Sequence, residues 1–221
     1  MQPISDAVNT VVFFPASAYC GGMTRDSATT RELILDAATS LLASRGAEHA
    51  TVRKVAAEAG LSPGAVQHHF KTRDELIAAV YEHTAELFRD DLEATISGIG
   101  SPAERFRAAC HLLAGCADDS DRTRAATAAW MAFAGIAATG GPAAPGYREV
   151  WQQVEDNLAA AVGDAEEAAL LLATLDGIAV ARLTEPDRMT IERGRALVDK
   201  QLARLAVADD YAGGSARGHG A

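Results

Sequence analysis

Residues 51–73 read TVRKVAAEAGLSPGAVQHHFKTR, and this stretch decides the fold of the N-terminal part of the chain. Thr51 has the side chain of a helix N-cap, and apolar residues follow it at the i, i+3, i+4, i+7 spacing of one helical face. Gly60 ends this helix, since glycine enters the left-handed conformation without a Cβ penalty. Ser62 then caps a second short helix, with Pro63 at the first position, where a missing N–H costs nothing. Two short helices joined by a glycine turn predict a helix-turn-helix, whose second helix can lie in a DNA major groove.

Charge supports this interpretation locally but not over the whole chain. The formal net charge is −10, which by itself disfavours nucleic acid as a partner. Within residues 51–73, four basic side chains oppose only Glu58, so the local balance is +3. A local cationic face on an acidic protein suits phosphate binding confined to that face. The alternative is an ordinary helical hairpin with solvated lysines.

Composition indicates an all-α protein, and the absence of catalytic motifs predicts that it is not an enzyme. The 221 residues include only 5% aromatics and are rich in alanine and leucine, which suits packed helices better than sheets. Cys20, Cys110 and Cys116 form neither a disulfide framework nor a metal spacing with the histidines, so a reducing cytoplasm is the expected location. The sequence has no nucleophile–base pair, metal cluster or phosphate loop, so we expect no catalytic residues, no metal and no cofactor.

Residues 1–26 differ from the rest and are expected to be a disordered extension. Their apolar run, Val11 to Phe14, is broken by Pro15 and is too short to span a membrane. A secretory signal would need a basic segment before the apolar run, and the sequence has none. We therefore expect Met23 to be the functional start.

Further helices are predicted on both sides of the motif. Thr29-x-x-Glu32 is a capping box that opens a helix closed by Gly46, and Thr72-x-x-Glu75 opens another after the motif. Ser101 and Pro102 start a helix that runs towards residue 117. The remaining helices are expected over 122–138, 147–162, 165–183 and 187–208, with a loop over 140–146 and a flexible tail over 209–221.

Residues 31–83 resemble the N-terminal DNA-binding domain of the TetR (tetracycline repressor) family of transcriptional regulators. The resemblance rests on Ala37-Ala38-x-x-Leu41-Leu42, Gly46, Thr51-Val52-Arg53, Leu61-Ser62-x-Gly64-x-Val66, His69-Phe70 and Asp74-Glu75-Leu76. Two positions depart from the family pattern: Gln67 stands where tyrosine is usual, and Arg73 where lysine is usual. Arg73 keeps a phosphate-binding charge, whereas Gln67 can bond a base edge or a phosphate.

The resemblance implies a helix-turn-helix domain over 27–73 and a helical effector-binding and dimerisation domain over 74–208. It also implies which residues face double-stranded DNA: Arg53, Gly64, Ala65, Gln67, His68, His69, Lys71 and Arg73. Basic groups at helix ends would bind phosphates, while amide and imidazole groups in mid-helix can read bases. Phe70 is expected in the core. The sequence leaves open whether both His68 and His69 reach DNA or one of them packs inward.

The C-terminal helices suggest a homodimer with a small-molecule site. The helix over 166–183 is apolar on almost every side, and one of the last helices of a small domain is rarely buried on every side by its own chain. We therefore expect it to contact a second subunit, through Leu170, Ala173, Gly177 and Ala181. Trp130 with Phe133, and Leu175-Asp176-Gly177, are similar to the betaine-regulator type within the family. The candidate effector-pocket residues are Phe106, Cys110, Trp130, Phe133 and Trp151, for which plain core packing is the alternative.

Together these features predict a repressor that a small-molecule effector releases from a palindromic operator. The alternative function is that of a helical partner-binding protein without sequence-specific DNA binding.

Overall fold

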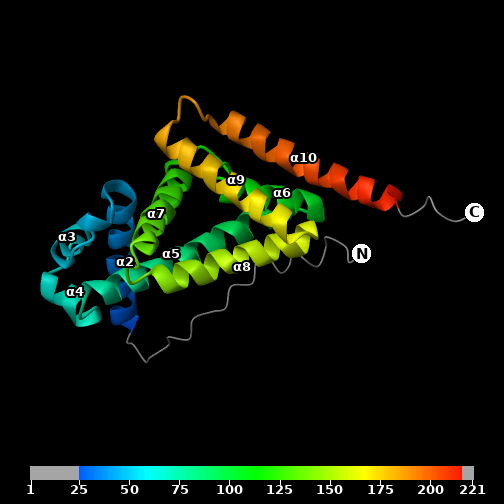
Figure 1. Ribbon diagram of the computed structural model, residues 1–221. Coiled ribbons are helices and arrows are strands. Elements are labelled where there is room, and N and C mark those ends of the chain that lie inside the picture. The colour runs from blue at the N-terminus through cyan, green and yellow to red at the C-terminus, as the bar shows by residue number, and fades with distance from the viewer. Residues whose placement is uncertain (1–24, 216–221) are drawn as a thin grey trace, which may run out of the picture. The chain divides into compact units, whose positions relative to one another are not determined.

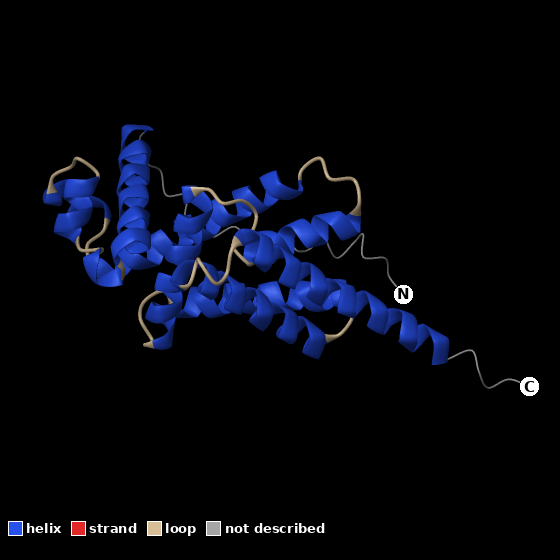
Figure 2. Cartoon of the chain, turned by 90° about the horizontal axis from the view of Figure 1, so that it is seen from above, coloured by secondary structure: helices blue, strands red, loops and turns tan. Residues whose placement is uncertain are grey.

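The computed structural model describes residues 25–215, and all regular secondary structure in this range is helical (Figures 1 and 2). This confirms the all-α class. The elements are α2 (Arg25–Arg45), η1 (Ala47–His49), α3 (Val52–Glu58), α4 (Pro63–His69), α5 (Arg73–Ile96), α6 (Pro102–Leu113), α7 (Asp121–Ala138), α8 (Ala144–Val162), α9 (Ala165–Thr184) and α10 (Ile191–Ser215). Among these helices none is both long and apolar enough to cross a membrane.

Several predicted helix boundaries are wrong. Thr29 lies inside α2, which begins at Arg25, so the capping box at Thr29 does not start the helix. The expected loop over 140–146 ends early, because α8 begins at Ala144. Helix α10 starts at Ile191 and continues to Ser215, whereas the sequence predicted a helix over 187–208. The expected extension over 1–24, and residues 216–221, lie outside the described residues.

The contacts of the described residues group into two compact units. The first unit consists of residues 25–91 and 120–153, and the second of residues 92–119 and 154–215. The helix-turn-helix therefore shares a unit with α7 and the first part of α8. The division expected from the sequence, after Arg73, lies within the first unit.

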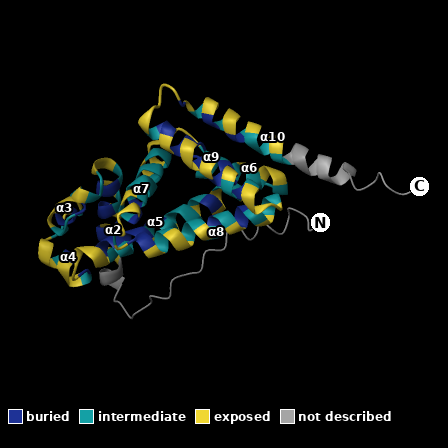
Figure 3. Ribbon diagram, viewed as in Figure 1, coloured by how far each residue is buried: buried dark blue, intermediate teal, exposed yellow. Residues whose placement is uncertain are grey.

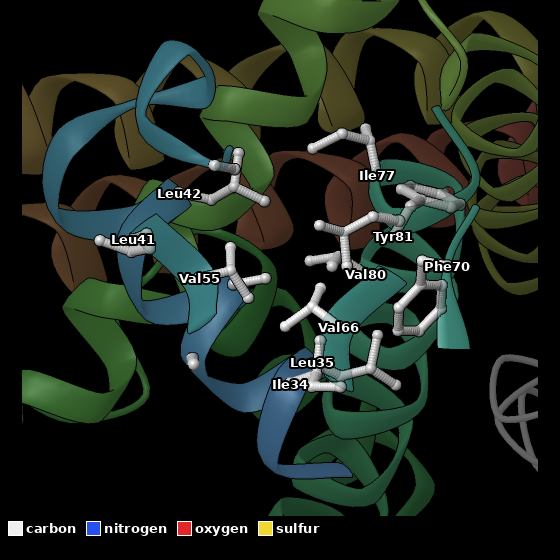
Figure 4. Packing of buried hydrophobic residues seen from close by; sticks show 14 of the residues in the cluster. Ile34, Leu35, Leu41, Leu42, Val55, Val66, Phe70, Ile77, Val80 and Tyr81 are labelled. Carbon is white, nitrogen blue, oxygen red and sulfur yellow. The ribbon is translucent and has the colours of Figure 1, made fainter. Parts of the chain in front are cut away.

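The core of the first unit is built on one face of α2. Ile34, Leu35 and Leu42 are almost fully buried against side chains of α3, α4 and α5 (Figure 4). Each such side chain contributes roughly 1.5–3 kcal/mol through burial. This buried face of α2, which we call the α2 stripe, covers both motif helices and fixes their position on the unit.

The second unit packs α9 and α10 against α6. The guanidinium of Arg182, which is buried, donates to Gly115 O at 2.7 Å and to Asp119 Oδ1 at 2.8 Å. Arg195 Nε donates to Cys116 O at 2.8 Å. These two arginines donate hydrogen bonds to backbone carbonyls that follow the C-terminal end of α6, and so hold this segment in place.

Candidate nucleic-acid interface

The local sequence builds the helix-turn-helix as predicted. Thr51 Oγ1 accepts a hydrogen bond from Lys54 N at 3.4 Å, and Ser62 Oγ accepts one from Ala65 N at 3.2 Å. Between the two helices Gly60 has a φ of 68°, in the left-handed region. Leu61 N donates back to Ala56 O at 2.8 Å, which closes the end of α3.

Helix α4 has one buried and one exposed side. Val66 is fully buried and Phe70, which follows the helix, is 5% exposed, so both anchor α4 to the core. Phe70 was predicted to be a core residue, and it is. Gly64, Gln67 and His68 are all exposed, and their i, i+3, i+4 spacing places them on a single helical face. We call these three residues the α4 outer face; Ala65 beside it is half-buried.

The two adjacent histidines have different environments. His68 is exposed, whereas His69 is half-buried, with its ring centroid 6.4 Å from that of Phe70. Their own rings meet edge to face at 5.5 Å. Burial lowers the pKa of His69, and the neighbouring basic side chains of His68, Arg31 and Lys71 lower it further. Of the two histidines, it is therefore His69 that packs inward.

Basic side chains flank the α4 outer face. Arg53 and Lys54 are exposed on α3. Lys71 Nζ donates to His68 O at 3.3 Å, and its backbone N–H donates to Glu75 Oε2 at 2.8 Å. These groups carry the cationic charge that the sequence places in this stretch.

Arg73 has a contact that the sequence did not predict. Its guanidinium donates to Ala47 O at 2.7 Å, which ties the start of α5 to η1. Arg73 is exposed, so the rest of the guanidinium faces solvent. The residue therefore has a structural contact beside its expected role at phosphate.

Arg31 is a basic residue of this region that sequence reasoning missed. Its guanidinium carbon lies 5.6 Å from the centroid of the Phe70 ring, at cation–π distance. The available signal was a basic residue one turn before Ile34 and Leu35 of the buried α2 stripe. That pattern does not reveal a contact with the end of α4.

Three of the five candidate effector residues lie together in the first unit. The Trp130 ring centroid is 6.4 Å from that of Phe133 and 5.8 Å from that of Trp151. Three aromatic residues that the sequence did not single out complete the group, which we call the Trp130 cluster: Tyr81, Phe88 and Tyr147. The indole nitrogen of Trp151 is buried and has no hydrogen-bond partner among the described residues.

The other two effector candidates, Phe106 and Cys110, belong to α6 in the second unit. Phe106 is half-buried and Cys110 is fully buried. Burial raises the pKa of the Cys110 thiol to about 12. These two candidates therefore belong to a different unit from the Trp130 cluster.

Helix α9 has one buried side and one exposed apolar side (Figure 3). Leu171, Leu175 and Ile178 face the interior. Three of the expected dimer residues, Leu170, Ala173 and Gly177, are exposed, and Leu170 is 55% exposed. The fourth, Ala181, is only 6% exposed within its own chain and lies on the buried side of α9.

Val180, which the sequence analysis did not single out, is 42% exposed on the same helix. We call Leu170, Ala173, Gly177 and Val180 the α9 outer strip. Their spacing of three to four residues keeps them on one side of the helix. The strip is the exposed apolar face that a second subunit could cover.

Comparison with known proteins gives two family matches. Residues 34–80 match the model described as "Bacterial regulatory proteins, tetR family", and residues 102–207 match "BetI-type transcriptional repressor, C-terminal". The structure of a transcriptional regulator from Rhodococcus sp. Rha1 superposes with a TM-score of 0.68 at 30% identity, over 80% of this chain and 96% of that one.

Curated relatives of this chain are also transcriptional regulators. The HTH-type transcriptional regulator BetI from Brucella anthropi is 37% identical over 103 residues, which is 47% of this chain and 51% of the relative. The match thus spans about half the length of that relative. The HTH-type transcriptional regulator PksA from Bacillus subtilis is 27% identical over 194 residues, 83% of this chain and 93% of the relative.

Proposed function

Because the chain belongs to the TetR family of bacterial transcriptional regulators, we propose that it represses transcription from a palindromic DNA operator and leaves that operator when a small molecule binds. The observation that carries the proposal is the α4 outer face, exposed and flanked by Arg53, Lys71 and Arg73. An exposed polar helix face with cations on both sides matches the shape and charge of a major groove. A regulator of this kind works in the cytoplasm, where the DNA is.

The residues divide into base readers and phosphate binders. The Gln67 amide presents a donor and an acceptor, the pair needed for an adenine edge, and the His68 imidazole can serve as a donor. Gly64 and Ala65 have little or no side chain, so the backbone can approach DNA closely. Arg53, Lys71 and Arg73 supply charge for phosphates, which positions the helix without reading sequence.

We propose that the α9 outer strip forms the core of a homodimer interface. A monomer would leave Leu170 and Val180 in water, and soluble proteins limit contiguous apolar patches of this kind. A two-fold dimer also presents two copies of α4 to half-sites about one DNA turn apart, which is the geometry of a palindrome.

We propose that the effector binds at the Trp130 cluster. Aromatic side chains supply most of the contact area in small-molecule sites, and a few polar groups set the orientation. The buried Trp151 indole N–H is a donor in need of an acceptor, which a ligand oxygen could supply. Tyr81 belongs to this cluster and to α5, whose first turn carries Arg73, so the effector site and the DNA-binding helices share one unit.

A gel-shift assay with the intergenic DNA beside the protein's own gene tests the proposal. The protein should retard this duplex in the presence of excess unrelated DNA. Gln67→Ala should reduce the preference for the specific duplex, whereas Arg204→Ala, an exposed change on α10, should not. A wild-type protein that binds the intergenic DNA no better than unrelated DNA would favour a partner-binding role instead.

A further inference from the structure

Four basic side chains converge at the C-terminal end of α4. His68 and His69 come from α4 itself, Arg31 from α2 and Lys71 from the turn before α5. The His68 and His69 rings meet at 5.5 Å, and Lys71 Nζ reaches His68 O at 3.3 Å. The Arg31 guanidinium lies over Phe70, the residue next to His69. Three separate segments thus bring basic side chains to one spot.

The charge at this spot is not neutralised within the part of the chain that the structure describes. Arg31 makes no ion pair or hydrogen bond there and is held only against the Phe70 ring. The Glu75 carboxylate accepts from the backbone N–H of Lys71 at 2.8 Å and not from the Lys71 ammonium group. The groups that act on His69 are His68 from α4, Arg31 from α2 and Lys71 from the turn; all three are basic side chains, and none is a carboxylate.

Such a cluster is unfavourable unless an anion joins it. Like charges held together repel, and an anion placed among them converts repulsion into attraction. The anion that the proposed function brings to this end of α4 is a phosphodiester of the DNA backbone. Arginine supplies a planar set of donors suited to phosphate, and the Phe70 ring fixes its plane.

We propose that Arg31, His69 and Lys71 form a phosphate-binding site at the C-terminal end of α4, and that phosphate binding there is coupled to protonation of His69. The inference rests on the proposed DNA-binding function and adds Arg31 to the interface. It also makes DNA binding take up a proton, which the other proposed contacts do not require.

The direction of the pH effect follows from the two states of His69. In the free protein its pKa is lowered from 6.5 by burial and by the neighbouring cations. A phosphate at this site favours the charged imidazole, so the pKa is higher in the complex. Between these two pKa values the complex holds one more proton per subunit than the free protein. DNA affinity therefore rises as the pH falls through that interval, and at higher pH His69 has no pH-dependent effect.

Fluorescence anisotropy with a labelled duplex measures this coupling. For the wild type, we expect affinity to rise by up to about tenfold per pH unit for each subunit within the interval. His69→Gln should remove most of this rise and leave binding at alkaline pH intact. Arg31→Gln should reduce the slope of log affinity against log salt by about 0.9 per subunit at all pH values, and Arg31→Lys should restore it.

Matched controls separate these effects from general damage. Arg204→Gln removes an exposed arginine of α10, and His111→Gln removes a histidine of α6, both in the second unit. Neither should change the salt slope or the pH dependence. NMR titration of the imidazoles gives a readout independent of DNA: Arg31→Gln should move the pKa of His69 upward in the free protein, because one repelling cation is gone.

The outcomes distinguish this inference from the proposed function. A wild type that binds duplex DNA at no pH would overturn both. A wild type that binds its specific duplex while Arg31→Gln keeps the full salt slope would overturn the phosphate site alone. A pH dependence that survives His69→Gln and disappears in His68→Gln would show that His68, and not His69, takes up the proton. That result would overturn the coupling.

Discussion

Arg73 combines a structural contact with an expected role at DNA. One N–H of its guanidinium donates a hydrogen bond to Ala47 O, and the residue is otherwise exposed. The side chain of Lys71, two residues earlier, makes a single long hydrogen bond among the described residues, at 3.3 Å to His68 O. The two cations should therefore differ in what they contribute to folding even if they contribute equally to DNA binding.

Arg73→Ala and Lys71→Ala test this difference. Both should lower the salt slope of DNA binding by about 0.9 per subunit, since each removes one phosphate contact. Arg73→Ala should also lower the free energy of unfolding by about 1 kcal/mol, because Ala47 O loses its donor. Urea unfolding and salt-dependent anisotropy measure the two effects. Equal unfolding energies for both variants would show that the bond to Ala47 does not stabilise the fold.

Residue by residue, the sequence predicts local contacts better than distant ones. The Thr51 and Ser62 caps, the Gly60 turn and the burial of Phe70 all follow from patterns within one or two turns. The bond from Arg73 to Ala47 joins residues 26 positions apart, and the position of Arg31 over Phe70 joins different helices. No periodicity encodes such contacts, because they depend on how the helices are packed.

At the scale of the element, the two glycines around the turn have opposite roles. Gly60 has a φ of 68°, and a Cβ added there would meet nothing within 4 Å, so only its backbone conformation requires glycine. Gly64 is helical, and its added Cβ would meet only Ser62 Oγ at 3.8 Å. The fold therefore does not require glycine at position 64. The absence of a side chain there is consistent with close approach of the backbone to DNA.

Gly60→Ala and Gly64→Ala should move stability in opposite directions. Gly60→Ala should cost roughly 1–2 kcal/mol, the strain of alanine in the left-handed region. Gly64→Ala should stabilise α4 by about 0.5 kcal/mol, yet weaken DNA binding, because a methyl group enters the interface. Thermal melts and gel shifts of both variants provide the measurements. A Gly64→Ala protein with unchanged operator affinity would remove position 64 from the DNA contact.

Helices α6 and α10 are joined by a charged cluster centred on Asp199. Arg107 donates to both carboxylate oxygens at 2.6 Å, and His111 Nε2 lies 2.9 Å from Oδ1. The hydrogen bonds from Arg107, followed by those of His111, hold the pKa of Asp199 below its usual 3.8. The carboxylate therefore stabilises the fold above pH 3.8, and this stability is lost as the pH falls through the lowered value.

Asp199→Asn should accordingly lower the melting temperature at neutral pH, and the difference from wild type should shrink below pH 3.8. Asp187→Asn, at an exposed position before α10, is the matched control and should change little at either pH. Melting followed by circular dichroism over a pH series decides it. A difference that stays constant down to acid pH would mean that Asp199 acts through packing and not through its charge.

At the scale of the whole molecule, the proposed homodimer depends on α9. The sequence indicated a helix apolar almost all round, and the exposed positions of Leu170, Ala173 and Gly177 fit a partner surface. Ala181 lies on the buried side of α9, because composition does not say which side of a helix meets α6 and α10. The Trp130 cluster was likewise only half predicted, since Tyr81 and Tyr147 join it through tertiary packing.

Gly177→Arg places a long charged side chain in the middle of the α9 outer strip. If this strip is the dimer interface, the variant should sediment as a monomer and lose roughly 10²–10⁴ in operator affinity, because the second DNA-binding domain is no longer tethered. Ala125→Arg, at an exposed position of α7, should remain dimeric. Analytical ultracentrifugation gives the answer; a well-folded Gly177→Arg dimer that binds tightly would place the interface elsewhere.

The most direct test of the central claim is selection of binding sites from a pool of random duplexes with the full-length protein, followed by sequencing. The account predicts enrichment of one motif made of two inverted half-sites, with centres separated by about one DNA turn. It further predicts that Gln67→Ala relaxes the same position in both half-sites. Enrichment of no motif at all, with binding that depends only on salt, would contradict sequence-specific regulation by this protein.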